Sequence, residues 1–397
     1  MNIKELQALV NPIYITAKGL LNLLIAGGDP DALKLVPHMI PEDLKKKVEK
    51  RPPPEMVTCF KIGHMARSDI FNTVALKCGK QTVIDLPCGY STRCFKVADN
   101  GQKYFGFDLP IVIDEIKDIT SKVVTEKQKD LISFNAVDAT NYDSMRKVLK
   151  DVKGEICIIT EGLLPYLNES ELISMCQAIH KLLSEFGGCW ITADGGGNFS
   201  IYPLTFEAMF QGDKEKKGAM IKGYMNFFSN VQSFKNSFSA NNFEGAKEFL
   251  EKQGFIIKEE SVANYMNKLK CVPEDKEEAL KESLSKIKIW TMTIDKKDDI
   301  KINEEKKIFN LECNLIDGIF NVKIEGRLDT LTAPELLKKY KETEGIKSIK
   351  VDINKMSFIS SAGIRVLKMM IKELESKDKF EIIGANEDIQ EMLKQLD

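Results

Sequence analysis

Residues 82–93 read Thr-Val-Ile-Asp-Leu-Pro-Cys-Gly-Tyr-Ser-Thr-Arg, which is an apolar strand followed by a loop of small residues and the start of a helix. In a doubly wound α/β sheet, the loop at the carboxyl end of such a strand lies under the ligand. Gly89 would let the backbone approach that ligand closely, because glycine has no Cβ atom. The loop has one glycine where dinucleotide sites usually have three, so an ordinary strand-to-helix turn is the alternative interpretation.

Strand and helix patterns alternate along the first 295 residues. Amphipathic helical stretches, such as residues 169–186 and 244–253, lie between most of the strand candidates. Alternating units of this kind predict an α/β fold with a doubly wound parallel sheet and helices on both faces. The last two strands could form an antiparallel pair at the edge. The strands are expected at residues 82–86, 103–109, 131–137, 155–160, 189–193, 255–259 and 287–294.

A charged segment divides the chain. Residues 296–307 are dense in Lys, Asp and Glu, which is typical of an exposed linker. The predicted domains are therefore residues 1–295 and 308–397, and a length of 397 residues suits two or three domains. The second would be a small α/β domain with a hairpin turn at Asp317-Gly318. Its elements are expected in the order strand 308–316, strand 319–325, helix 332–344, strand 348–353, helix 362–375, strand 380–383 and helix 387–396.

Composition narrows the classes of function. The formal net charge of −2 argues against nucleic-acid binding as the main role. No stretch reaches the roughly 20 apolar residues that a membrane span needs, and the N-terminal sequence lacks a signal-peptide cleavage pattern. The nine cysteines form no CxxC pair, which favours reduced thiols and no metal site. A cytoplasmic protein is expected.

Acidic residues follow three consecutive strand candidates. Asp108 lies about 20 positions after the glycine loop, where a carboxylate can accept both hydroxyls of a ribose. Asp138 follows the third strand, where an adenine amino group could be held, and Glu161 follows the fourth. Asp108 alone would suit a helix N-cap better. Three acidic strand ends together favour a ligand that contains a nucleoside.

Three strings resemble a known family. They are Asp-Leu-Pro-Cys-Gly-Tyr-Ser-Thr-Arg at residues 85–93, Phe-Asp-Leu-Pro at 107–110 and Thr-Glu-Gly-Leu-Leu-Pro-Tyr-Leu at 160–167. With them, residues 10–295 resemble class I methyltransferases of the leucine carboxyl methyltransferase type, which bind S-adenosylmethionine. The resemblance implies a seven-stranded, Rossmann-like sheet with one antiparallel edge strand.

The same resemblance assigns residues to the cofactor. It implies that Gly89 lies against the methionine part, Asp108 binds the ribose and Asp138 lies by the adenine. Glu161 would line the pocket near the amino-acid end. Arg67 matches a family arginine that pairs with the cofactor carboxylate, which suits a fork-shaped guanidinium, and a surface helix arginine is the alternative. The predicted cofactor site also includes three neighbouring residues: Asp85, Leu109 and Ala139.

The catalytic residues are harder to identify. Pro87 stands where family members usually have glycine, so the loop could approach the cofactor differently. Methyl transfer to a carboxylate needs mainly positioning, and no catalytic dyad is identified. His64 and Tyr166 could lie near the acceptor or serve only the structure. An irregular, glycine-spotted stretch over residues 195–224 is expected to form a lid on the acceptor side.

The second domain carries a different signal. Residues 357–363 read Ser-Phe-Ile-Ser-Ser-Ala-Gly between a strand and a helix, so Ser360 and Ser361 suit a helix N-cap. A phosphate there would lie beside a helix N-terminus, which binds anions well. This segment and residues 326–335 resemble parts of the STAS domain of bacterial anti-sigma factor antagonists. Asp329, in the second of these segments, is expected to cap a helix or to contact a partner. The resemblance aligns Ser361 with the family's phosphorylated serine. Ser360 replaces an aspartate, and capping alone is the alternative for both serines.

Three hypotheses of function result. The first is an S-adenosylmethionine-dependent O-methyltransferase with a carboxyl or hydroxyl acceptor, S-adenosylhomocysteine as product and a regulatory STAS domain. The second is an anti-sigma factor antagonist whose methyltransferase-like domain senses S-adenosylmethionine without turnover. The third gives the STAS domain a role in dimerisation only. The implied partners are an unidentified methyl acceptor and an anti-sigma factor or serine-kinase-like protein.

Overall fold

The computed structural model describes residues 3–11, 14–39, 53–197, 200–229, 243–295 and 309–396. The predicted linker, residues 296–307, lies outside these ranges. The contacts divide the chain into two compact units. The larger unit comprises Ile15–Asp108 and Val112–Asp299, and the smaller unit comprises Met1–Tyr14, Leu109–Ile111 and Ile300–Asp397.

The larger unit is built on a seven-stranded sheet in the order β3-β2-β1-β4-β5-β7-β6. All neighbouring pairs are parallel except those of β7, which runs antiparallel to both β5 and β6. The strand that runs against the others is therefore next to the edge, and β6 is the edge strand. The strands are β1 (Thr82–Asp85), β2 (Lys103–Asp108), β3 (Ile132–Ala136), β4 (Ile156–Thr160), β5 (Gly188–Thr192), β6 (Phe255–Ser261) and β7 (Lys288–Ile294).

The central strands owe their position to continuous apolar runs. Every residue of β1 and β4 is buried, as expected for parallel strands that are covered on both faces. All seven strands begin and end within two residues of the ranges expected from the sequence. The predicted doubly wound fold is confirmed.

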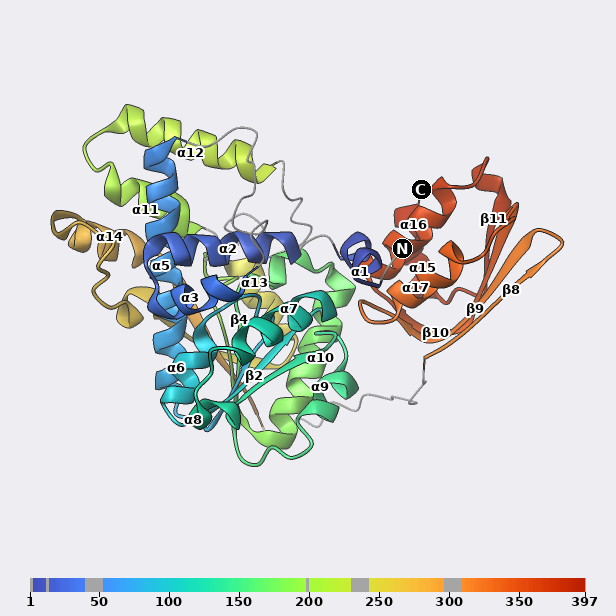
Figure 1. Ribbon diagram of the computed structural model, residues 1–397, viewed down its shortest axis with the longest axis horizontal. Coiled ribbons are helices and arrows are strands. Elements are labelled where there is room, and N and C mark those ends of the chain that lie inside the picture. The colour runs from blue at the N-terminus through green and yellow to red at the C-terminus, as the bar shows by residue number, and fades with distance from the viewer. Residues whose placement is uncertain are drawn as a thin grey trace. The chain divides into compact units, whose positions relative to one another are not determined.

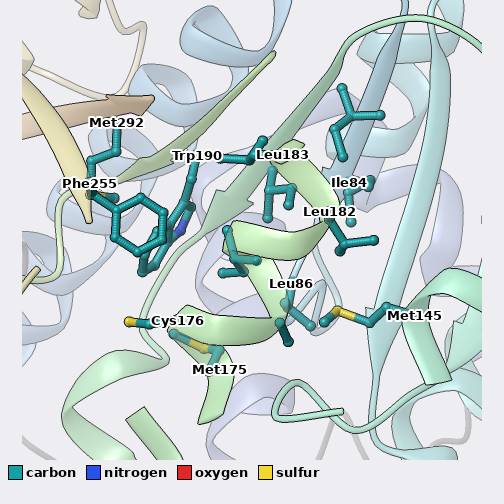
Figure 2. Close-up of a cluster of buried hydrophobic side chains, with 14 of the residues drawn as sticks. Ile84, Leu86, Met145, Met175, Cys176, Leu182, Leu183, Trp190, Phe255 and Met292 are labelled. Atoms are coloured by element: carbon teal, nitrogen blue, oxygen red, sulfur yellow. The ribbon is translucent and has the colours of Figure 1, made fainter. Parts of the chain in front are cut away.

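Helices cover both faces of this sheet (Figure 1). On one face lie α9 (Tyr142–Val148), α10 (Glu169–Phe186) and α13 (Phe243–Lys252), and on the other lie α5 (Pro54–Lys77) and α6 (Arg93–Asp99). Figure 2 shows how side chains of α10 meet Trp190, Phe255 and Met292 from the strands in a buried cluster. The other α-helices among the described residues of this unit are α2 (Tyr14–Gly27), α3 (Pro30–Leu35), α7 (Pro110–Ser121), α8 (Glu126–Lys129), α11 (Ile201–Met209), α12 (Lys214–Ser229) and α14 (Glu277–Leu284).

The stretch predicted to be an irregular lid is mainly helical, since α11 and α12 fill most of it. Two of its glycines, Gly195 and Gly196, have a packing role. A Cβ atom on Gly195 would lie 2.2 Å from the ring of Trp290, and one on Gly196 would lie 1.9 Å from the carbonyl oxygen of Lys288. Glycine is required here because β7 approaches the backbone closely.

The smaller unit contains a four-stranded sheet in the order β11-β10-β9-β8. Its hairpin turn has the expected left-handed residues, Asp317 with φ 51° and Gly318 with φ 82°. Strand β10 extends six residues beyond its predicted end at Ile353, because two irregularities let it keep pairing with β9 as far as Ile359. The elements are β8 (Asn310–Ile316), β9 (Ile319–Leu328), α15 (Ala333–Lys341), β10 (Ser348–Ile359), α16 (Ser361–Lys372), β11 (Phe380–Ile383) and α17 (Glu387–Leu393).

The first helix, α1 (Ile3–Val10), belongs to this smaller unit. Its side chains Leu6 and Val10 are part of the same apolar cluster as α15 and α16. The sequence predicted one domain over residues 1–295, and the contacts group α1 with the smaller unit. Within the described ranges, no helix combines the length and apolar character that crossing a membrane requires.

Candidate functional site

Four acidic residues lie at one edge of the seven-stranded sheet. Asp85 and Asp108 are the last residues of β1 and β2, and Asp138 and Glu161 follow β3 and β4 closely. Because β3, β2, β1 and β4 are adjacent and parallel, their carboxyl ends meet at the same edge. This is the edge at which open α/β sheets bind ligands.

The loop after β1 is fixed against the end of β2. Gly89 has a φ of 51°, which glycine adopts without strain, and its N–H donates to Oδ2 of Asp108 at 2.7 Å. The Cys88 N–H donates to the carbonyl of Phe107 at 2.9 Å. The peptide bond between Leu86 and Pro87 is cis. The structure thus brings together Gly89 and Asp108, which the sequence had paired by spacing.

Helix α2 lies over this loop. A Cβ atom on Gly89 would lie 3.5 Å from that of Ala17. Lys18 forms an ion pair of 2.8 Å with Glu115, and its ammonium lies 5.9 Å from the ring centre of Tyr90. Tyr90 in turn donates a hydrogen bond to Glu115. These contacts hold an N-terminal helix above the glycine loop.

Asp138 is almost completely buried just beyond β3. Its Oδ1 atom accepts a hydrogen bond of 2.8 Å from the Thr140 N–H and another from the Thr140 hydroxyl. Leu109 and Ala139, the neighbours of the two strand-end aspartates, are half-buried. All of them lie at the edge that the sequence had indicated.

Glu161 lies between two arginines. Arg67 Nε is 2.5 Å from Glu161 Oε1, and Arg93 Nη2 donates to Glu161 Oε2. Arg93 Nη1 also lies 2.5 Å from Oδ1 of Asp85, whose Oδ2 accepts from the Tyr104 hydroxyl at 2.9 Å. Positive and negative side chains therefore alternate through a buried chain of ion pairs. The sequence had assigned Arg67, Glu161 and Asp85 to the cofactor one by one, whereas in the structure they are linked to one another.

The electrostatics of this chain follow from its burial. Burial alone would raise the pKa of Glu161, but the guanidiniums of Arg67 and Arg93 outweigh it, and that pKa lies below its ordinary value. Burial raises the pKa of Asp85, and Arg93 offsets this only in part. Glu161 is therefore a firmly ionised carboxylate held between two cations.

Asp194, which follows β5, fixes the loop after Glu161. Its carboxylate accepts from the N–H groups of Gly162 and Leu163, both at 2.8 Å, and of Leu164 at 3.0 Å. Three backbone donors on one buried carboxylate position the start of the loop rigidly. This support was not identified from the sequence.

Helix α5 presents Phe60, His64 and Arg67 at intervals of four and three residues, which places them on one helical face. Phe60 packs edge-on against Tyr202 of α11, with ring centres 5.3 Å apart. Burial lowers the pKa of His64 to about 3, and the nearby Arg67 adds to this. Within the described residues, His64 Nδ1 has no hydrogen-bond partner. Tyr166, the other candidate, is half-buried in a short 3-10 helix, Leu164–Tyr166.

Arg93 is the residue of the candidate site that sequence reasoning missed. It lies inside the quoted motif, directly before Cys94 and Phe95, and its side chain is 2% exposed. A charged residue directly before two apolar ones at a helix start was the available signal, but its acidic partners become neighbours only in the folded sheet. Among the described residues, no group of three or more His, Cys, Asp or Glu side chains could hold a metal ion.

In the smaller unit, Ser360 is the N-cap of α16. Its hydroxyl accepts from the N–H groups of Ala362 at 3.2 Å and Gly363 at 3.3 Å. Ser361 is the first residue of the helix and is half-buried. The capping role expected for both serines therefore falls to Ser360. Asp329 accepts from the Leu331 N–H at 3.1 Å, which is a local turn contact.

Comparison with known proteins bears on both units. Residues 310–397 match the family model of the STAS domain. Similar solved structures include the methyltransferase domain of bacterial CtHen1 (15% identity, 58% of this chain and all of that chain, TM-score 0.38). A second is magnesium protoporphyrin IX methyltransferase from Synechocystis PCC 6803 with bound S-adenosylhomocysteine (12% identity, 62% of this chain and 90% of that chain, TM-score 0.35). A third is human N-acetylserotonin methyltransferase with S-adenosylmethionine (12% identity, 60% of this chain and 55% of that chain, TM-score 0.33). No curated protein matches the chain.

The order of the strands, with β7 antiparallel to its neighbours, gives the larger unit a Rossmann-like α/β fold. The smaller unit carries a STAS domain. The predicted combination of these two folds in one chain is confirmed. The narrower resemblance to leucine carboxyl methyltransferases stays a prediction.

Proposed function

We propose that the larger unit binds S-adenosylmethionine at the edge where β1 to β4 end and transfers its methyl group to an oxygen acceptor. The observation that carries this proposal is the hydrogen bond between Gly89 and Asp108, which holds a carboxylate beside a close-approach loop. That arrangement suits the ribose of a nucleoside cofactor. The STAS domain would supply a protein-interaction surface.

The chemistry of the residues fits this cofactor. Its ribose hydroxyls and adenine amino group are hydrogen-bond donors, and Asp108 and Asp138 are acceptors at the matching strand ends. The carboxylate of the cofactor needs a cation as its partner. Arg67 has five N–H donors, and its Nε–H donates to Glu161. When bound, the cofactor supplies a methyl group activated by its sulfonium. The residues of this chain would bind and orient it.

The state of His64 favours a carboxylate as the methyl acceptor. A hydroxyl must lose its proton during methyl transfer, which calls for a general base. A histidine with a pKa of about 3 is a weak base. A carboxylate is already ionised at neutral pH and needs only positioning.

The experiment that tests this function is an assay of S-adenosylhomocysteine release with matched carboxylate and alcohol acceptors. We expect release with carboxylates and base-labile methyl esters as products. Glu185→Gln, which changes an exposed ion pair with Arg146, serves as the control variant and should retain activity. Binding of the cofactor without release for any acceptor would contradict methyl transfer and favour the cofactor-sensing hypothesis.

For the STAS domain, we propose Ser361 as a phosphorylation site that regulates binding of an anti-sigma-factor-like or serine-kinase-like protein. The support is its position as first residue of α16, next to the cap Ser360. A phosphate adds about two negative charges at such a position. We expect Ser361→Asp to weaken capture of the partner. Equal capture by Ser361→Asp and the wild type would contradict this role.

A further inference from the structure

We propose that the face of the STAS domain formed by α15 and α16 binds a short amphipathic helix, and that α1 of this chain occupies that face in cis. Leu6 and Val10 of α1 are 1% and 0% exposed. Both belong to the apolar cluster that includes side chains of α15 and α16. The helix α1 itself lies beside α15 and α16 (Figure 1). Four residues separate them, so they lie on one side of α1.

The carboxyl end of α1 is bound as well. Arg365 of α16 donates a hydrogen bond from Nη1 to the carbonyl of Val10. The last carbonyls of a helix lack partners within it, and a cation there also interacts favourably with the helix dipole. The surface therefore combines an apolar seat for two side chains with a guanidinium for the helix end. These are the elements of a helix-in-groove site.

Two features of α1 indicate that another helix can replace it on this surface. An eight-residue helix is too short to be stable alone in water, so α1 folds only while it is docked. Gln7 Oε1 and Asn11 Nδ2 are buried without a hydrogen-bond partner among the described residues. Each such atom lowers the affinity of α1 for the surface. A partner helix without these polar side chains could replace it.

The same geometry links the surface to Ser361. Ser361 and Arg365 are four residues apart on α16, so they lie on the same side of that helix. A phosphate on Ser361 would attract the guanidinium that holds the end of α1. Only this link between Ser361 and α1 rests on the proposed phosphorylation. The helix-binding surface itself depends neither on that modification nor on methyl transfer.

The partner that this surface fits is a protein that presents two apolar side chains four residues apart near the carboxyl end of a short helix. A labelled peptide of residues 1–12 is the probe. It should bind saturably to a chain that lacks residues 1–11. It should bind at least about tenfold more weakly to the full chain, because a tethered helix competes at a high effective concentration.

Matched substitutions separate docking from a general change in polarity. Leu6→Asp in the peptide should abolish binding, whereas Leu9→Asp should not, since Leu9 is 42% exposed. In the full chain, hydrogen exchange should show that Leu6→Asp opens α15 and α16 while β9 and β10 stay protected. Leu9→Asp should change none of these elements.

Three results would overturn the inference. One is a folded, truncated chain that does not bind the peptide. Another is identical exchange in the Leu6→Asp and Leu9→Asp chains. The third is that β9 and β10 lose protection together with α15 and α16 in the Leu6→Asp chain. That result would mean that the rest of the unit cannot stay folded without α1. Binding of S-adenosylhomocysteine, measured on the same samples, reports separately on the proposed function.

Discussion

At the scale of single residues, Arg93 ties the predicted cofactor residues together. It is 2% exposed and lies between Asp85 and Glu161. A buried arginine with two carboxylates is costly to desolvate, and it persists where it positions other groups. Here it fixes the orientation of Glu161, whose other oxygen holds Arg67. Glu161 and Arg67, which is proposed to bind the cofactor carboxylate, are thus held in one ion-paired cluster.

Asp108 provides the sharpest test of the cofactor position. Asp108→Asn removes a charged acceptor, and hydrogen bonds to charged groups contribute about 1.5–3 kcal/mol. We expect the Kd for S-adenosylhomocysteine to rise by roughly 10–150-fold, as measured by calorimetry. Asp118→Asn, at an exposed position of α7, is the control and should leave the Kd unchanged. A folded Asp108→Asn chain with wild-type affinity would rule out this placement of the ribose.

His64 predicts a pH dependence of stability. Its pKa lies at about 3 in the folded chain because of burial, against 6.5 ordinarily. Below pH 6.5 the unfolded state therefore binds a proton that the folded state does not, so stability falls as the pH drops from 6.5 towards 3. The slope should approach about 1.4 kcal/mol per pH unit.

The matching variant is His64→Gln. Its urea-unfolding free energy should lose this slope between pH 6.5 and 5, a range in which carboxylates titrate little. Parallel pH profiles for His64→Gln and the wild type would show that His64 takes up its proton in the folded state as well. The inference that His64 is a weak base would then fail.

At the scale of elements, local patterns predicted the strands well. Apolar runs and small-residue loops are local properties, and every strand of the larger unit was placed within two residues. The pairing of one strand with another is not a local property. The continuation of β10 to Ile359 depends on pairing with β9 across two irregularities, which no pattern within β10 reveals.

The same reason explains why the sequence indicated neither the contacts of α1 with the smaller unit nor the role of Arg93. The apolar residues of α1 predict an amphipathic helix but not the sheet or helices against which it packs. Arg93 is close in sequence to Asp85, yet its other partner, Glu161, is 68 residues away. The three acidic strand ends at Asp108, Asp138 and Glu161 were predictable because parallel strands share an edge. The cations that join them depend on side-chain contacts between distant segments.

The cap of α16 separates the two serines. Ser360→Ala removes the acceptor of two backbone N–H groups and should destabilise the smaller unit by about 1 kcal/mol. Ser361→Ala, one residue inside the helix, should have a smaller effect. Thermal unfolding of the two variants measures this difference. Equal destabilisation would contradict the assignment of Ser360 as the cap.

At the scale of the whole molecule, two separate apolar clusters support the two units. We predict two calorimetric transitions. S-adenosylhomocysteine should raise the transition temperature of the larger unit only. At a free concentration of 100 times its Kd, it should add about 2.7 kcal/mol to the unfolding free energy of that unit. Ser360→Ala should lower only the other transition. A single transition that both changes shift together would show that the units unfold cooperatively.

The most direct test of the central claim is calorimetric titration of the full chain with S-adenosylmethionine, S-adenosylhomocysteine and, for comparison, NAD. The claim is that the edge formed by Asp85, Asp108, Asp138 and Glu161 is a site for S-adenosylmethionine. We predict micromolar, one-to-one binding of both S-adenosyl compounds and no saturable binding of NAD. If a folded chain binds neither S-adenosyl compound, the seven-stranded unit is not a cofactor site and the proposed function is wrong.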